Sequence, residues 1–324
     1  MTVGPVAALG AIVAAIVIAE RRPALRRGFR WLPVPLWCYA LPLLAAELGW
    51  LPRDPAPYRL LTDRLLPLAL ALLLLGADLP AVMRTGRRAL LAALVGAAGI
   101  VGGVAAGAVL LGAWLPPDAW KGAGALAGTW TGGTMNLLAL RSLLAMPDAL
   151  FAPLIVVDAV IAYGWMALLI AGSGVQRPLN RWLRAPDAMD AAEQHSTAQA
   201  DRATPSRLRP LLLCGVAALA LAVGSRVAAP HLPTSLLVSS VSGWTVLLVT
   251  TGALALSLDP ALRRAGAHGT VLGYPLLYLV LAATGAQARL DALWSSPAWL
   301  LLGLVVVLVH GTLLLVAGRA LRIP

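Results

Sequence analysis

Nine apolar runs, each about long enough to cross a lipid bilayer, dominate this chain of 324 residues. A hydrocarbon core about 30 Å thick needs about 20 apolar residues per helix. The runs lie near residues 3–19, 31–50, 60–77, 89–115, 149–172, 210–227, 235–258, 270–287 and 298–317. Tryptophans fall at or near run ends, as in an interfacial aromatic belt, at Trp31, Trp50, Trp114, Trp120 and Trp299. The sequence therefore predicts an all-α polytopic membrane protein with about nine membrane-crossing helices.

The composition agrees with this class and excludes several others. Apolar residues make up 60% of the chain and charged residues only 12%, about half the charged share of a soluble domain. The formal net charge of +11 comes from arginines between the apolar runs, so topology and anionic lipid explain it better than nucleic acid. Cys38 and Cys214 lie inside apolar runs and define no disulfide or metal spacing. The sequence contains no nucleotide-binding fingerprint, zinc-protease motif or hydrolase motif, so we expect no enzyme activity and no cofactor.

Residues 120–145 contain a break that a plain membrane helix does not tolerate. Two apolar arms flank the segment Thr129-Trp-Thr-Gly-Gly-Thr-Met-Asn136, which combines a Gly pair with three Thr residues and an Asn. Irregular backbone at membrane depth persists only where it is buried in protein or lines a cavity. We therefore predict one broken or re-entrant helix in addition to the nine runs.

The positive-inside rule favours a broken segment that enters and leaves on the same face of the membrane. With the N-terminus outside, this arrangement places 18 basic residues inside and 6 outside, whereas a single crossing gives 11 inside and 14 outside. The inside set is Arg21, Arg22, Arg26, Arg27, Arg30, Arg84, Arg87, Arg88, Arg177, Arg181, Arg184, Arg202, Arg207, Arg209, Arg263, Arg264, Arg319 and Arg322. The outside set is Arg53, Arg59, Arg64, Lys121, Arg226 and Arg289. We predict a bacterial inner-membrane protein with its N-terminus outside and its C-terminus cytoplasmic.

A weak internal repeat, with an offset of 209 residues, matches this inverted topology. One helix ends at Ala77 and is followed by an eleven-residue linker and a helix from Ala89; the same pattern runs from Ala286 to Ala298. Inverted repeats with a broken helix at the midplane are characteristic of secondary transporters. The predicted organisation is a first membrane half at 1–172 with the broken element 120–145, a cytoplasmic linker at 173–209, and a second membrane half at 210–324 that lacks a counterpart to the broken element.

Asp158 is the polar residue that most needs an explanation, because it lies inside the apolar run from Leu150 to Ile170. A carboxylate at that depth costs several kcal/mol unless it faces a partner, a cation or a water-filled cavity. It predicts a proton or sodium site, and the alternative is a structural Asp bonded to a helix terminus. Asn136 and Thr134 can offer neutral oxygens to the same Na⁺.

The Gly pair would free backbone amides and carbonyls for a ligand, although small residues also serve tight helix packing. His310 lies in the middle of the last run and can titrate near neutral pH, or it can simply hydrogen-bond between helices. The predicted ion- or substrate-binding residues are Thr131, Gly132, Gly133, Thr134, Asn136 and Asp158, with His310 and Thr129 as secondary candidates.

The segment Gly128-Thr-Trp-Thr-Gly-Gly-Thr-Met-Asn136 resembles the Tyr-Ile-Gly-Gly-Ser-Val-Asn signature of the YjcL-like bacterial membrane proteins, the domain of unknown function 819. The order of the other blocks is similar across roughly residues 30–324. These blocks are Leu73-Leu-Leu-Gly-Ala-Asp78-Leu, Phe151, Val157-Asp158, Gly273-Tyr-Pro-Leu-Leu-Tyr-Leu279, Thr284-Gly-Ala286 and Val309-His310. The resemblance implies a fold of the cation/proton antiporter and anion transporter type, and it implies no known substrate.

The chain departs from the family pattern in two ways. The family has Asn after the membrane Asp, where this chain has Ala159. The family also continues with a second Gly-Gly element, which by the internal offset would fall near position 341 or 342, beyond Pro324. The chain thus resembles a C-terminally shortened member, whose isolated form we expect to show little ion-coupled flux.

These features predict an ion-coupled secondary transporter that uses H⁺ or Na⁺ to move a small solute across the lipid bilayer. The alternative is a non-transporting membrane remnant, or a partner subunit of a split transporter. A homodimer or a separate partner subunit that supplies the missing element remains open at this point. Substrate, coupling ion and direction of transport are not encoded in any motif that we recognise.

Overall fold

A computed structural model describes residues 3–23, 25, 28–29, 34–80, 87–172, 176–184, 208–233, 238, 240–288 and 296–322. Every regular element in these ranges is helical. The first half contains α1 (Val3–Glu20), α3 (Val34–Glu47), α4 (Ala56–Leu74), α6 (Arg87–Leu111), the 3-10 turn η1 (Gly112–Trp114), α7 (Ala119–Gly132), α8 (Thr134–Leu143) and α9 (Asp148–Gly172). The second half contains α10 (Gln176–Leu183), α12 (Leu208–Ala228), η3 (Ala229–His231), α13 (Val241–Leu256), α14 (Pro260–Gly266), α15 (Thr270–Gln287) and α16 (Ser296–Leu321).

Each of the nine predicted apolar runs coincides with a helix, namely α1, α3, α4, α6, α9, α12, α13, α15 and α16. Within the described residues, four helical segments are long and apolar enough to cross a membrane by themselves. These are Leu90–Trp114, Leu208–His231, Thr270–Gln287 and Pro297–Leu321. A fifth is added if α13 and α14, which meet at a bend of 117°, count as one span. The chain is therefore a multi-pass helical membrane protein.

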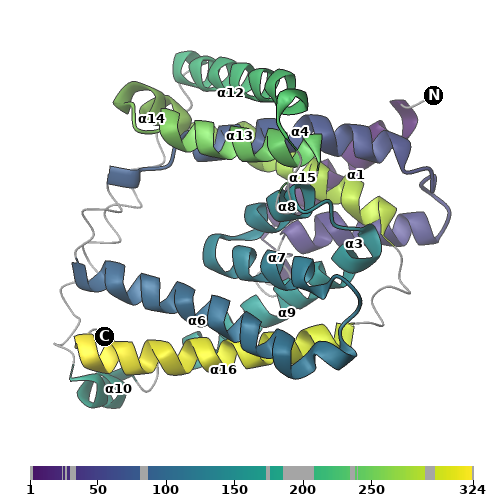
Figure 1. Cartoon of the computed structure of the whole chain (residues 1–324). Helices are drawn as coiled ribbons and strands as arrows, with labels where there is room; N and C mark the ends of the chain where they lie inside the picture. The colour runs from purple at the N-terminus through teal and green to yellow at the C-terminus, as the bar shows by residue number, and fades with distance from the viewer. Residues whose placement is uncertain are drawn as a thin grey trace.

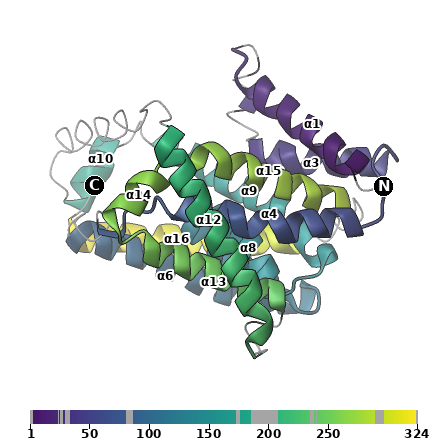
Figure 2. The same ribbon diagram turned by 90° about the horizontal axis from the view of Figure 1, so that it is seen from above.

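The helices form two packed groups with the broken segment between them (Figure 1). Helices α6 and α16 lie side by side in one group. The other group is built on α4, α12, α13 and α15, with α1, α3 and α14 packed against them. Helices α7, α8 and α9 lie between the groups, because α7 contacts α6, α9 contacts α16 and α8 contacts α13. Seen from above, α12 crosses over α13 and α4 on the outside of its group (Figure 2).

The helix pairs α4/α15 and α6/α16 are antiparallel and closely packed. Gly269, at the start of α15, abuts the carbonyl oxygen of Leu72 near the end of α4. Along α6, Gly96 faces His310 and Gly107 faces Leu302, so residue numbers fall on one helix as they rise on the other. A Cβ at Gly107 would lie 3.0 Å from the Leu302 side chain. Small residues here allow the close backbone approach on which helix pairs in lipid depend.

The predicted broken segment is a hairpin of two short helices that fold back on each other. Helix α7 ends at Gly132 and α8 begins at Thr134, with Gly133 between them at φ 95° and ψ 172°. The two arms are in close contact, since a Cβ at Gly128 would lie 2.2 Å from the Leu140 side chain. The break thus falls inside the segment 129–136 that the sequence indicated.

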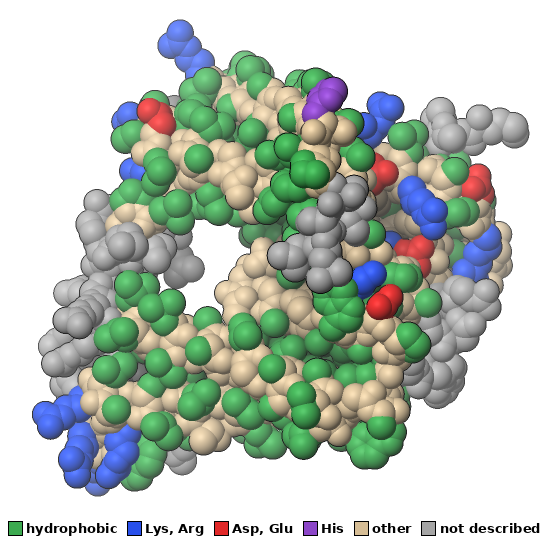
Figure 3. Space-filling model, in the orientation of Figure 1, with side chains coloured by type: hydrophobic (Ala, Val, Ile, Leu, Met, Phe, Trp, Pro, Cys, Tyr) green, Lys and Arg blue, Asp and Glu red, His purple; other side chains and the backbone are tan. Residues whose placement is uncertain are grey.

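The surface over α6 and α16 is largely hydrophobic, with Lys and Arg side chains gathered towards the ends of the molecule (Figure 3). Trp50, Trp114 and Trp120 are exposed, at 78%, 69% and 48%, which fits the predicted interfacial belt. Trp299 is different, because it is fully buried and packs against Gly122 of α7. Trp31 and residues 185–207 of the predicted linker lie outside the described residues, while α10 forms part of the linker's start.

Candidate functional site

A cavity of about 670 Å³ lies where the tip of the α7–α8 hairpin meets α9 and α16. Most of the residues predicted from sequence to form the site line this one cavity. They are Thr129, Thr131, Gly132, Gly133, Asp158 and His310. The rest of the wall is mainly aliphatic and aromatic, and comes from α3, α6, α9, α15 and α16. Residues from both ends of the chain thus converge on the helix break.

Asp158 is half-buried in this cavity and makes no ion pair with any described residue. The hydroxyl of Thr129 donates a hydrogen bond to its Oδ1 at 3.4 Å, which is near the upper limit for such a bond. The indole N–H of Trp130 approaches the same carboxylate without reaching normal hydrogen-bond geometry. A carboxylate with so few donors can accept a cation or a proton from the cavity.

The helix break places backbone polar groups beside this carboxylate. The amide of Gly133 donates to the carbonyl of Thr129, and the Gly133 carbonyl accepts from the amide of Asn136 at 2.9 Å. The Thr131 hydroxyl donates to the carbonyls of Ala127 at 2.8 Å and Gly128 at 3.2 Å. Because Thr131 lines the cavity, its oxygen still has a lone pair to offer to a ligand.

Asn136 lies behind the break, and it is not among the cavity-lining residues. Its side-chain amide donates to the carbonyl of Gly128 at 3.0 Å, which ties the start of α8 to the last turn of α7. A Cβ at Gly132 would lie 2.1 Å from Nδ2 of Asn136, so the glycine creates the space for this bond. Asn136 therefore holds the hairpin tip together, and its predicted role as an ion ligand stays a prediction. Thr134 begins α8 directly after Gly133.

Three aromatic rings line the cavity, one of them from the broken segment itself. Trp130 comes from α7, Trp165 from α9 and His310 from α16. Trp165 and His310 meet edge to face with ring centroids 6.0 Å apart. His310 Nδ1 lies 2.9 Å from the Gly96 carbonyl, which can only accept, so Nδ1 carries a proton and donates.

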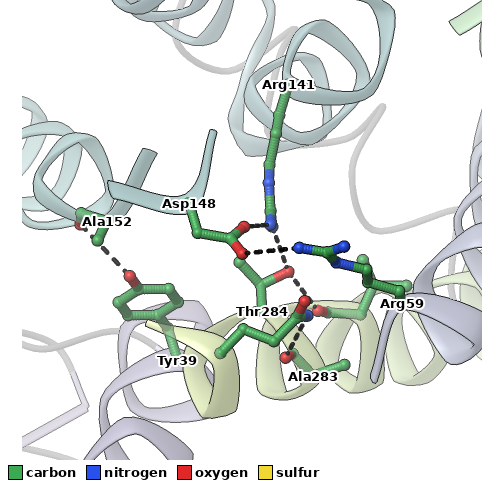
Figure 4. A network of polar contacts seen from close by, with 9 residues as sticks. Tyr39, Arg59, Arg141, Asp148, Ala152, Ala283 and Thr284 are labelled. Carbon is green, nitrogen blue, oxygen red and sulfur yellow. Dashed lines mark hydrogen bonds and ion pairs between the residues drawn. The ribbon is translucent and has the colours of Figure 1, made fainter. Parts of the chain in front are cut away.

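The other end of the hairpin is fixed by a buried polar network (Figure 4). Arg141 of α8 forms an ion pair with Asp148 of α9 and donates to the Thr284 hydroxyl of α15 at 2.8 Å. Its guanidinium also stacks on Phe151, 4.5 Å from the ring centroid. Arg59 lies 3.9 Å from Asp148 on the more exposed side. Arg141 thus joins α8, α9 and α15. Asp148 lies ten residues before Asp158 on α9, which corresponds to about 15 Å along the helix.

The carboxylate, the glycine pair, two threonines and His310 were predicted from the sequence and do line the same cavity. The two tryptophans and the arginine network were not predicted. Trp130 belongs to the broken segment itself, so the composition of that segment held a signal for it. Trp165 lies seven residues after Asp158, which is two helical turns along α9 and therefore on the same face. The ion pair could have been predicted from the positions of its partners, since Arg141 lies at the end of α8 and Asp148 begins α9.

A comparison with protein families matches residues 7–324 to a family model described as a protein of unknown function, DUF819. Neither the search of curated proteins nor the search of solved structures finds a match to this chain. The family match covers the helix break, Asp158, His310 and the Arg141 network together.

Proposed function

We propose that this chain, a member of the DUF819 family, is a secondary transporter that couples the movement of a small solute to H⁺ or Na⁺. One observation carries the proposal: the half-buried Asp158 carboxylate, without an ion pair among the described residues, lies beside a helix break in a cavity of about 670 Å³. Ionisable residues at membrane depth are expensive and usually mark ion or substrate pathways.

The coupling role of Asp158 follows from its surroundings. Its carboxylate receives one long hydrogen bond, from Thr129, and the cavity wall contains no Lys or Arg among the described residues. The charged form therefore needs a cation from solution, and the protonated form needs none. Binding of H⁺ or Na⁺ at Asp158 changes the charge of the cavity and so changes its affinity for a solute.

The helix pairing supports an inverted repeat. The sequence repeat relates α4 to α15 and α6 to α16, and both of these pairs pack together antiparallel. Two halves related by an axis in the membrane plane require that equivalent helices run in opposite directions. The repeat and the proposed nine crossings with a re-entrant α7–α8 hairpin are consistent with this arrangement.

The contacts of the arginines support the proposed orientation, with the N-terminus outside and the C-terminus in the cytoplasm. Arg53, Arg59 and Arg226, all expected outside, bond to Ala288, Asp148 and Asp63 at one end of the bundle. Arg263 and Arg319, both expected inside, bond to Asp78 and Trp182. The two chain ends lie on opposite sides of the molecule in Figure 1.

Reconstitution of the purified chain into liposomes tests the proposal. If a second copy of the chain completes the site, an imposed Na⁺ or pH gradient should drive ion movement through the native chain, detected with a fluorescent dye inside the vesicles. Such movement would contradict the low flux that the sequence predicts for the isolated chain. Asp158→Asn should abolish this movement, because the amide keeps the shape of the side chain but cannot exchange a proton or balance a cation.

Asp118→Asn is the matched control, because Asp118 lies at the start of α7, is largely exposed and, among the described residues, forms an ion pair with Lys121 alone. It should transport at the native rate. Equal transport by native protein and Asp158→Asn would refute the coupling role. Absence of ion movement in the native chain, correctly folded and inserted, would favour the non-transporting alternative.

A further inference from the structure

The cavity around Asp158 combines one carboxylate with a wall that is mostly apolar and aromatic, apart from Thr129, Thr131 and His310. Its described lining residues include two tryptophans and eight aliphatic side chains from Pro, Leu, Ile and Val. A ligand that fits must present one positive charge to the carboxylate and an apolar body to the rest of the wall. We propose that the solute of this cavity is a small organic cation, such as a quaternary or protonated amine, and this inference rests on the proposed function.

The groups on the cavity wall and its volume argue against three other classes of solute: anions, sugar-like neutral molecules and bare metal ions. An anion would meet the Asp158 carboxylate, and none of the described lining residues is a Lys or Arg that could compensate it. A sugar-like neutral solute would need many hydrogen-bonding groups, but the hydroxyls of Thr129 and Thr131 already donate to Asp158 and to backbone carbonyls. A bare metal ion would leave most of the 670 Å³ unfilled, a volume well within the range of about 300–1,000 Å³ typical of small-molecule sites.

Trp130 and Trp165 supply the contacts that a cation with an apolar shell needs. The face of an indole ring attracts a cation through its quadrupole, and quaternary ammonium groups are bound by aromatic cages in this way. Both rings line the cavity that contains the carboxylate, so they can surround a charge that Asp158 neutralises. The indole N–H of Trp130 approaches the Asp158 carboxylate without normal hydrogen-bond geometry, so this ring lies next to the charge that a cation would neutralise.

Two glycines of α16 make room for the Trp130 and Trp165 rings. A Cβ at Gly303 would lie 3.4 Å from the Trp130 ring, and a Cβ at Gly311 would lie 3.0 Å from the Trp165 ring. The two glycines are eight residues apart, so they fall on the same face of the helix about two turns apart. Each indole thus packs against a glycine on the side of α16 that faces α7 and α9.

A cation and a proton would compete for the same carboxylate. The titratable groups that face the cavity are Asp158 of α9 and His310 of α16, and the described lining residues of α3, α6, α7 and α15 contribute none. Protonation of Asp158 removes the charge that holds the ligand, so one organic cation would leave for each proton that binds. Such competition is the basis of an exchange of protons for cations.

Calorimetric titration of the full chain in detergent with benzyltrimethylammonium tests the inference. The native protein should bind this cation, and the apparent Kd should rise by up to about tenfold per unit fall in pH once Asp158 becomes protonated. Asp158→Asn should lose binding, and Trp165→Ala should weaken it about tenfold. Benzenesulfonate, an anion of similar size, should not bind.

Trp114→Ala is the matched control for the aromatic contribution, because Trp114 is 69% exposed and does not line the cavity. Its affinity for the cation should equal that of the native protein. His310→Asn should keep the pH dependence, which would assign the competing proton to Asp158. If Asp158→Asn fails to fold, the pH dependence and Trp165→Ala still decide the matter.

Binding of benzenesulfonate as tight as that of the cation would overturn the inference, and so would a native affinity in Trp165→Ala. Loss of the pH dependence in His310→Asn would also overturn it. The inference and the proposed function can fail separately. Ion-driven flux without cation binding would reject only the solute class, whereas pH-dependent cation binding without flux would reject only transport.

Discussion

Replacement of Gly133 by Ala isolates the energy of the helix break. Gly133 has φ 95° and ψ 172°, a conformation that residues with a Cβ almost never adopt. Apart from Gly133 and its two chain neighbours, no described atom lies within 4 Å of the position that a Cβ would take, so the substitution introduces backbone strain without a steric clash. Strain of this kind is on the order of 1–3 kcal/mol, and we expect the Gly133→Ala variant to lose about that much stability.

Gly124 of α7 provides a control with the opposite sign. A Cβ there also meets nothing within 4 Å, but Gly124 lies inside the helix. Because Ala is the better helix former, Gly124→Ala should stabilise the protein by about 0.5–1 kcal/mol. Thermal unfolding of both variants in the same detergent measures the difference. If Gly133→Ala is as stable as Gly124→Ala, the break is not held in the conformation described here and the reasoning fails.

Two further predictions concern the fixed end of the hairpin and the topology. Arg141→Met should destabilise the protein by about 2–3 kcal/mol, because it removes a largely buried guanidinium and leaves the partly buried Asp148 with the exposed Arg59 at 3.9 Å. Arg53→Met, which removes the more exposed arginine of the pair with Glu47, should cost less than about 1 kcal/mol in the same unfolding assay. Equal effects would show that the Arg141 network does not anchor the hairpin. A cysteine at position 191 should resist membrane-impermeant thiol reagents in intact cells, while one at position 54 should react. Both native cysteines are buried, so they should add little background labelling. Labelling at 191 from outside would overturn the proposed topology.

The helices could be predicted from sequence because lipid leaves the backbone few options. A run of about 20 apolar residues must satisfy its own amides and carbonyls, and a helix does this within the segment. The break could be predicted for the same reason, since Gly132 and Gly133 beside polar residues do not suit a continuous helix. The structure locates the irregular residue at Gly133, within the predicted segment.

The surroundings of Asp158 could not be predicted, because they depend on how helices far apart in sequence rotate against each other. Trp165 and His310 are 145 residues apart, yet their rings are in contact. The burial of Trp299 was unpredictable for the same reason. It lies at a run end like the exposed Trp114, but it is completely buried. Position along a run sets the depth of a side chain in the membrane, whereas helix packing decides whether it faces lipid or protein.

The two ends of the α7–α8 hairpin differ in a way that bears on the proposed transport. At one end Arg141 binds Asp148 and Thr284, and these charge-assisted bonds tie α8 to α9 and α15. At the tip, Asn136 bonds to Gly128 across the break, and Thr129 makes a long bond to Asp158 of α9; neither bond is an ion pair. A ligand that binds Asp158 competes with the Thr129 hydroxyl and so acts on the weakly held end. Because the arginine network holds the opposite end, we expect such a ligand to shift the tip without separating α8 from the bundle. The proposed coupling would then link ligand charge at Asp158 to the position of the break.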